Sequence, residues 1–190
     1  MRHMEVSMKK FSVKTIVAIG IGAALFFVLA SYVAIPTPIP NVKFSLQYAV
    51  LAIMSVLFGP VAGLLMGLIG HFLTDLAGGW GIWWSWVICS GLFGLVMGLV
   101  GLKLNLEEGE FSVKSGILFN VGQIVGHLVC WAVIAPILDI LIYSEPSNKV
   151  FLQGLVSAGG NILTTAIVGT LLCVAYVAAR PKTGSLTKEK

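Results

Sequence analysis

Long apolar runs follow one another through most of the sequence, and most are about as long as a helix that spans a membrane. Of the 190 residues, 57% are hydrophobic and 11% are charged, whereas soluble domains carry about 25% charged residues. A soluble fold could not bury so much apolar surface, so the solvent of this chain must be lipid. The sequence therefore predicts an all-α membrane bundle of six transmembrane helices, at residues 12–34, 45–58, 61–77, 82–102, 113–137 and 150–179.

Basic residues gather at one set of helix ends. If both termini are cytoplasmic, only Lys43 and Lys149 fall on the outer side, as the positive-inside rule favours. The basic residues expected on the cytoplasmic side are Arg2, Lys9, Lys10, Lys14, Lys103, Lys114, Arg180, Lys182, Lys188 and Lys190. The sequence thus predicts cytoplasmic N- and C-termini, with basic tails at residues 1–11 and 180–190 around one transmembrane domain at residues 12–179.

The stretch at residues 71–86 concentrates ionisable and aromatic side chains between two apolar runs. His71 and Asp75 are four residues apart, which places both on one face of a helix. Ionisable groups inside a membrane are costly and usually functional. Tryptophans, which favour the boundary between lipid and water, follow a Gly-Gly break at Trp80, Trp83, Trp84 and Trp86. We interpret this stretch as one wall of a ligand pocket near one membrane face.

Other segments bring polar and aromatic residues to a similar depth on the outer side, at 1.5 Å of helix rise per residue. Apolar walls with a few placed polar groups and aromatic rings suit a small, flat, polar organic ligand. The predicted substrate-binding residues are Lys43, Gln47, His71, Asp75, Trp80, Trp84, His127, Trp131 and Asn161.

Each of these residues also has a purely structural interpretation. The tryptophans could form an interfacial belt, and His71 could bond Asp75 only to stabilise the fold. His127 could be a satisfied core histidine, and Asn161 could join two helices. Three further charged residues are expected to be solvated in a loop: Asp139, Glu145 and Lys149. The joint pattern favours a pocket, because chance would scatter these groups over both halves of the membrane.

Several motifs of enzymes and metal sites are missing from the sequence. There is no Walker motif, so this chain is not expected to hydrolyse ATP itself. There is no HExxH motif or Cys/His cluster, and Cys89, Cys130 and Cys173 each lie inside an apolar run. The sequence therefore predicts a protein that is not an enzyme and holds neither a metal nor a cofactor.

Four local strings, together with six expected helices and two basic tails, carry a resemblance to a known family. They are Val-Ala-Ile-Gly-Ile-Gly-Ala-Ala-Leu from Val17, Leu-Gln-Tyr-Ala-Val from Leu46, Phe-Gly-Pro-Val-Ala-Gly from Phe58, and Gly-Ser-Leu-Thr-Lys near the C-terminus. Over nearly its whole length the chain resembles the S-components, the substrate-binding membrane subunits of energy-coupling factor (ECF) transporters.

The resemblance implies a protein of the bacterial plasma membrane that binds a vitamin or vitamin precursor at the outer face. It implies docking on a transmembrane coupling subunit, the T-component, together with two cytoplasmic ATPases that use the ATP. The family's docking motif on the first helix corresponds to Ala18, Gly22 and Ala23 here. The proline-rich loop at residues 36–44 resembles the family's lid over the ligand.

For the ligand, the residues favour a hydroxymethylpyrimidine or a pyridoxine-type heterocycle, because tryptophans can stack on the ring while His71, Asp75, His127 and Asn161 bond its polar atoms. Two other functions stay open. One is a stand-alone proton-coupled carrier that uses the histidines and Asp75 as a relay. The other is a membrane enzyme or scaffold, which the lack of a catalytic motif disfavours.

Overall fold

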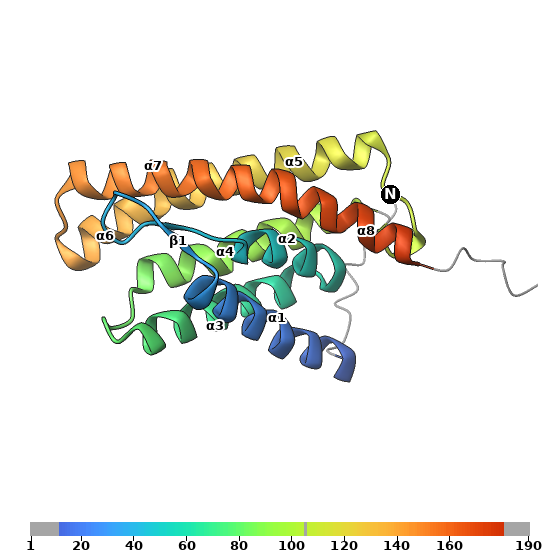
Figure 1. Cartoon of the computed structure of the whole chain (residues 1–190), viewed down its shortest axis with the longest axis horizontal. Coiled ribbons are helices and arrows are strands. Elements are labelled where there is room, and N and C mark those ends of the chain that lie inside the picture. The colour runs from blue at the N-terminus through green and yellow to red at the C-terminus, as the bar shows by residue number, and fades with distance from the viewer. Residues whose placement is uncertain (1–11, 105, 181–190) are drawn as a thin grey trace, which may run out of the picture.

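A computed structural model describes residues 12–104 and 106–180 and shows an almost entirely helical chain (Figure 1). The predicted tail at residues 1–11, all of the predicted tail at residues 180–190 except Arg180, and the C-terminal Gly-Ser-Leu-Thr-Lys string lie outside these described residues. Six of the counted basic residues lie outside them as well. The helices are α1 (Val13–Tyr32), α2 (Gln47–Phe58), α3 (Pro60–Gly78), α4 (Trp84–Gly101), α5 (Val113–His127), α6 (Ala135–Tyr143), α7 (Ser147–Thr164) and α8 (Thr170–Ala179).

Two of the predicted helices are longer than expected because short π-helical segments join their halves. The π-helix η2 (Leu128–Ile134) links α5 to α6, and η3 (Thr165–Gly169) links α7 to α8. The resulting continuous helices have 31 and 33 residues. Asp139, which was predicted to be a solvated loop residue, therefore lies inside α6 and is buried. That prediction was wrong because the apolar run does not end at Asp139: residues 140–143 are also apolar, and the helix continues through them to Tyr143.

Five helices in the described part of the chain are long and apolar enough to cross a membrane. The remaining predicted span, α2, has 12 residues, which corresponds to about 18 Å at 1.5 Å per residue. A hydrocarbon core of about 30 Å exceeds that length. The helical class is confirmed, but the described helices give five spans by length and one short apolar helix, where six spans were predicted.

The proline-rich segment after α1 forms a small hairpin. Strands β1 (Ile35–Pro36) and β2 (Lys43–Phe44) pair antiparallel, with Ile35 opposite Phe44 and Pro36 opposite Lys43. Inside the turn the Thr37 hydroxyl donates to the Val42 carbonyl at 2.8 Å. The short 3₁₀ helix η1 (Leu106–Glu108) lies in the connection between α4 and α5.

The connections fall at two opposite ends of the molecule (Figure 1). The hairpin, the α3–α4 loop and the α6–α7 turn lie at one end, on the left of the view. The start of α1, the start of α5 and the end of α8 lie at the other. Among described residues the first end carries Lys43 and Lys149, whereas the second carries Lys14, Lys103, Lys114 and Arg180.

The helices α3 and α4 approach closely because glycines line their interface. A side chain at Gly94 would overlap backbone atoms of Gly63, and one at Gly67 would overlap backbone atoms of Ser90. Small residues allow such close approach in membranes, where van der Waals packing replaces the hydrophobic driving force between helices. The α3–α4 pair also contacts α1 and α2, and α4 continues the packing to α5.

The face of α1 expected to dock a partner is turned inward. Ala18 and Ala23 are buried, and a side chain at Gly22 would clash with Met66 of α3. The opposite small residues, Gly20 and Ala24, are exposed. The Ala18–Gly22 pair therefore packs within this chain, and docking through Ala18, Gly22 and Ala23 stays a prediction.

We expect Gly94→Ala to destabilise the protein, because its new methyl group meets backbone that cannot move without separating α3 from α4. Overpacking of this kind costs about 1–3 kcal/mol, and we expect a fall in melting temperature on the order of 5 °C in detergent. Gly159→Ala is the matched control, since nothing lies within 4 Å of its added methyl group. An equal melting temperature for the two variants would contradict the proposed glycine interface.

Candidate ligand-binding site

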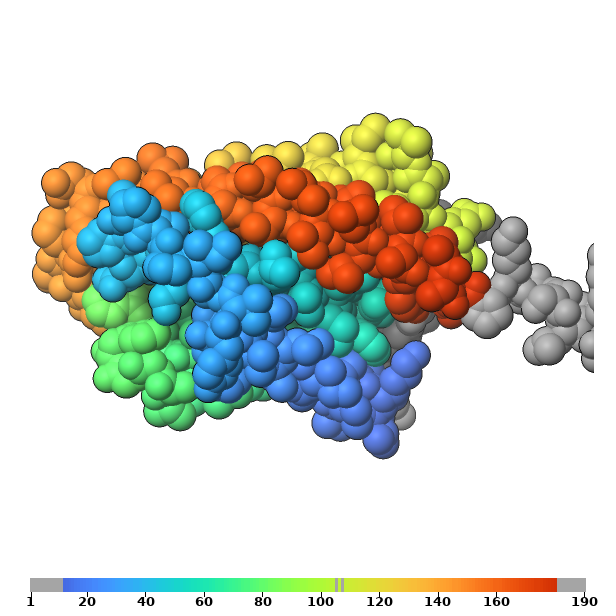
Figure 2. Space-filling model, in the orientation of Figure 1, coloured from blue at the N-terminus to red at the C-terminus, as the bar shows by residue number. Residues whose placement is uncertain are grey.

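A cavity of about 450 Å³ opens at the end of the molecule that carries the hairpin, the α3–α4 loop and the α6–α7 turn. In Figure 2 the hairpin segment, in light blue, lies across this end beside the orange surface of α7. The cavity lies among helices that are distant in sequence, since residues of α1, α2, α3, α4, η2 and α7 all line it. Its volume is in the range of about 300–1,000 Å³ found for pockets that hold drug-sized ligands.

Most of the predicted binding residues come together in this cavity. Its lining includes Lys43, Gln47, His71, Asp75, Trp80, Trp131 and Asn161. They come from the hairpin, α2, α3, the α3–α4 loop, η2 and α7. Polar groups that are distant in sequence therefore meet at one end of the bundle.

Trp84 and His127 do not line the cavity. Trp84 is half exposed on the outer surface, where its ring lies against Phe72 with 6.0 Å between centroids. His127 is fully buried below the cavity, stacked on Phe93 at 3.9 Å and bonded through Nε2 to Thr165 Oγ1 at 3.1 Å. His127 is thus a core residue, but its Nδ1 has no hydrogen-bond partner among the described residues, so it is not the fully satisfied core histidine of the structural interpretation.

Tyr48, Ser90 and His71 form a hydrogen-bonded chain at the bottom of the cavity. The Ser90 Oγ lies 2.8 Å from the Tyr48 hydroxyl and 2.6 Å from His71 Nδ1. The Tyr48 ring meets Trp131 edge-on at 5.2 Å between centroids. Since Ser90 is fully buried and does not line the cavity, it acts only through its two neighbours.

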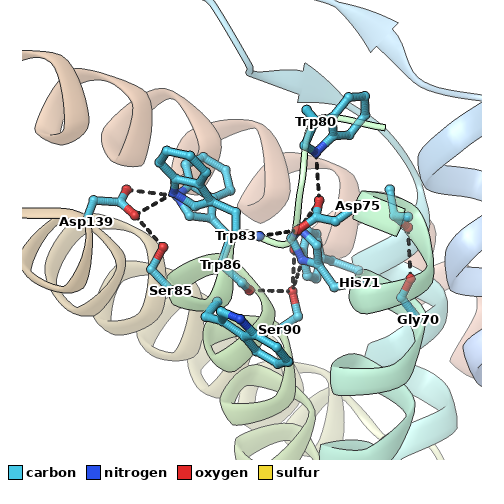
Figure 3. Close-up of polar contacts among 12 residues, drawn as sticks. Gly70, His71, Asp75, Trp80, Trp83, Ser85, Trp86, Ser90 and Asp139 are labelled. Carbon is cyan, nitrogen blue, oxygen red and sulfur yellow. Dashed lines mark hydrogen bonds and ion pairs between the residues drawn. The ribbon is translucent and has the colours of Figure 1, made fainter. Parts of the chain in front are cut away.

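Asp75 holds the segment that leads from α3 to α4. Its Oδ1 accepts from Trp80 Nε1 at 3.1 Å, and its Oδ2 accepts from the Trp83 backbone N–H at 2.9 Å. Gly79 ends α3 in a left-handed conformation, with φ of 74°, which allows the chain to turn back at once. Figure 3 shows how the Trp80 ring and the start of the return segment converge on this carboxylate.

Asp139 of α6 is the second buried carboxylate of the site. It accepts from Trp83 Nε1 at 2.7 Å, from Trp86 Nε1 at 2.9 Å and from the Ser85 hydroxyl (Figure 3). Tyr143, one turn further along α6, stacks on Trp83 with 4.2 Å between ring centroids. The Trp83 and Trp86 rings, which line the cavity, are therefore fixed by a residue outside it.

The hairpin closes the cavity through a few contacts. Gln153 Nε2 of α7 donates to the Pro40 carbonyl at 2.7 Å, and the Phe44 ring lies in the space left by Gly160. The Lys43 ammonium lies over the Trp80 ring, 5.5 Å from its centroid. This geometry agrees with a cover over the cavity, as the resemblance implied for residues 36–44.

The predicted set of substrate-binding residues left out several residues that line the cavity. They include Asn41, Tyr48, Trp83, Trp86, Lys149, Gln153 and Ser157. Gln153, Ser157 and Asn161 are four residues apart on one face of α7, and this spacing was a signal available in the sequence. The charged groups of the lining are of both signs, because Asp75, Lys43 and Lys149 all belong to it, and Lys149 also pairs with Glu145 at 2.7 Å. Such a lining suits a neutral or zwitterionic ligand.

We expect Asp139→Ala to disturb both the stability of the protein and its tryptophan fluorescence, because the change leaves two indole N–H groups and one hydroxyl without an acceptor. Breaking a buried charged network costs on the order of 3 kcal/mol. Glu145→Ala, which removes only an exposed pair, serves as the control and should cost less than about 1 kcal/mol. Matching melting curves and emission spectra for the two variants would rule out this role of Asp139.

Comparison with known proteins places the chain among transporter components. The model of the family described as ECF-type riboflavin transporter, S component, matches residues 10–178. Among curated relatives, UPF0397 proteins of Staphylococcus aureus strains MSSA476 and Newman are each 55% identical over 184 residues, and that of strain MRSA252 is 56% identical. Each alignment covers 96% of this chain and 100% of the relative. No solved structure matches.

Proposed function

Because the chain belongs to the family of ECF-type riboflavin transporter S components, we propose that it captures a vitamin or vitamin precursor for an ATP-driven importer. The observation that carries this proposal is the cavity at one end of the bundle, with aromatic walls and dispersed polar groups. Apolar walls with few polar groups are typical of small-molecule binding sites. As a member of a family of transporter components, the chain binds and hands on its ligand without changing it.

The cavity end faces the outside of the cell in this proposal, and both termini are cytoplasmic. The described lysines and arginines support this orientation, because four lie at the end away from the cavity and two beside it. Excess positive charge is retained on the cytoplasmic side. The short helix α2 then lies within the bilayer as the sixth helix, packed between α1, α3 and α4.

The proposed ligand is a planar heterocyclic vitamin. Indole and phenol rings of Trp80, Trp83, Trp86, Trp131 and Tyr48 line the cavity and can pack against a flat ring. A riboflavin-type ligand is favoured by the family description and by a volume that is large for one six-membered ring. A hydroxymethylpyrimidine or a pyridoxine-type molecule is the second candidate, on the aromatic and hydrogen-bonding groups alone.

Energy comes from partners in this proposal. A transmembrane T-component docks on this chain, and two cytoplasmic ATPases supply the ATP-driven step, as is general for the family. No cofactor is needed in this chain. The alternative, a stand-alone proton-coupled carrier, rests on the pair of His71 and Asp75, whose Nε2 and Oδ1 lie 3.7 Å apart in the cavity.

Two measurements test the function. Mass spectrometry of small molecules that co-purify with the protein should identify a heterocyclic vitamin or precursor. Uptake of that molecule into cells should require the T-component and both ATPases. Uptake into liposomes by this chain alone, driven by a pH gradient and lost in Asp75→Asn, would instead establish the carrier.

The docking face proposed for the T-component follows Gly20 and Ala24 on the exposed side of α1, in place of Ala18, Gly22 and Ala23. A side chain at Gly20 would meet nothing within 4 Å in this chain, so the position is open to a partner helix.

We expect Gly20→Trp and Ala24→Trp to abolish co-purification with the T-component while the melting temperature stays unchanged. Leu155→Trp, at an exposed position of α7, is the control and should leave assembly intact. Ala18→Trp should instead prevent folding, because Ala18 is buried. Normal assembly of the Gly20 and Ala24 variants would place the docking face elsewhere.

A further inference from the structure

The hydrogen bonds below the cavity, taken together with Asp75, indicate where the ring proton of His71 lies. Ser90 Oγ is within hydrogen-bond distance of Tyr48 Oη, His71 Nδ1 and the Trp86 carbonyl. A serine hydroxyl carries one proton and a neutral imidazole carries one. Figure 3 shows Ser90 between His71 and the Trp86 carbonyl, and its one proton can go to His71 Nδ1 at 2.6 Å or to that carbonyl at 3.1 Å. When Tyr48 donates to Ser90 and Ser90 donates to His71 Nδ1, the ring proton of His71 lies on Nε2.

The reverse direction of this chain is disfavoured by Asp75. If a neutral His71 donated from Nδ1 to Ser90, the bare lone pair of Nε2 would face Asp75 Oδ1 at 3.7 Å. Two acceptors would then repel each other in a poorly solvated place. A proton on Nε2 removes this repulsion, and a charged ring would carry that proton as well. His71 therefore presents an N–H donor beside Asp75.

Asp75 keeps the capacity to accept another hydrogen bond. Its Oδ1 and Oδ2 each accept one bond from the protein, from Trp80 and from Trp83. Each carboxylate oxygen has two lone pairs, so both oxygens can accept once more. Because His71 and Asp75 both line the cavity, its wall presents one fixed donor and one fixed acceptor on successive turns of α3.

We propose that His71 and Asp75 together recognise the edge of a planar heterocycle on which a hydrogen-bond acceptor stands next to a donor, with Ser90 as the positioning residue. Lactam, imide and aminopyrimidine edges have this arrangement: His71 Nε2–H donates to the carbonyl or ring nitrogen, and Asp75 accepts from the adjacent N–H. The inference rests on the proposed function, because it assigns a ligand class to the same cavity.

Two matched pairs of probes test the recognition of this edge. Riboflavin is compared with riboflavin methylated on its imide nitrogen, and aminohydroxymethylpyrimidine is compared with its dimethylamino analogue. Each methylation removes the N–H that Asp75 would accept and leaves the ring system in place. Dissociation constants are measured for the purified full chain in detergent. In at least one pair the unmethylated probe should bind about 10- to 100-fold more tightly, as a hydrogen bond to a charged group implies.

Three variants separate recognition from general loosening of the fold. In Asp75→Asn the ratio of the two dissociation constants, methylated over unmethylated, should fall towards one. In Ser90→Ala the ratio should fall several-fold, because a His71 that carries its proton on Nδ1 no longer holds the acceptor of the ligand, and the adjacent N–H then loses its alignment with Asp75. Ser55→Ala removes a buried hydroxyl that bonds only the Leu51 carbonyl and should leave the ratio unchanged. The ratio of two affinities is the decisive readout, since a merely structural defect weakens both probes alike.

Three outcomes would overturn the inference: equal affinity within both pairs, a preference that survives both Asp75→Asn and Ser90→Ala, or binding of none of the four probes. None of these removes the proposed function, which is decided by co-purified ligand and by uptake that depends on the ATPases. Failure of that uptake would count against the importer even where the recognition of the edge held.

Discussion

Two buried carboxylates hold the aromatic wall of the cavity, and the rest of the site depends on them. Asp75 fixes Trp80 and the Trp83 backbone from α3, and Asp139 fixes the indoles of Trp83 and Trp86 from α6. A carboxylate removed from water is costly unless its oxygens are satisfied. Here indole N–H groups, a backbone N–H and a hydroxyl satisfy them. The short irregular segment between α3 and α4 is thereby tied to helices on both of its sides.

The helices that carry the two carboxylates, α3 for Asp75 and α6 for Asp139, are positioned in different ways. Glycines bring α3 and α4 into backbone contact, so the positions of Asp75 and Ser90 relative to each other are set by close packing. On the other side, α6 follows the π-helical segment η2, which also supplies Trp131 to the cavity. Single π-helical turns occur often at functional sites, and this one adjusts which side chains of the long helix point inward.

The sequence was sufficient for the helical class, for most helix positions and for the convergence of polar groups at one end. It could not decide rotations about helix axes. On α1 both the Ala18–Gly22 and the Gly20–Ala24 faces are apolar, and lipid gives no contrast in polarity that separates a buried face from an exposed one. Trp84 was assigned to the cavity for a different reason. The irregular turn before α4 sets which indoles face inward, and the sequence does not reveal the path of that turn. Asp139 was missed because its donors are indoles about fifty residues earlier in the chain.

The boundary of the cavity is fixed to different degrees around its circumference. The aromatic wall is held by charge-assisted hydrogen bonds, which are among the stronger contacts in a protein. The hairpin is held by one amide–carbonyl bond from Gln153 to Pro40, by the Phe44 ring against Gly160 and by Lys43 over Trp80. A neutral hydrogen bond contributes only about 1 kcal/mol net, and an exposed cation–π contact contributes a similar amount. The polar contacts of the hairpin are therefore weaker than those of the aromatic wall, and the burial of Val42 adds an apolar contact to them.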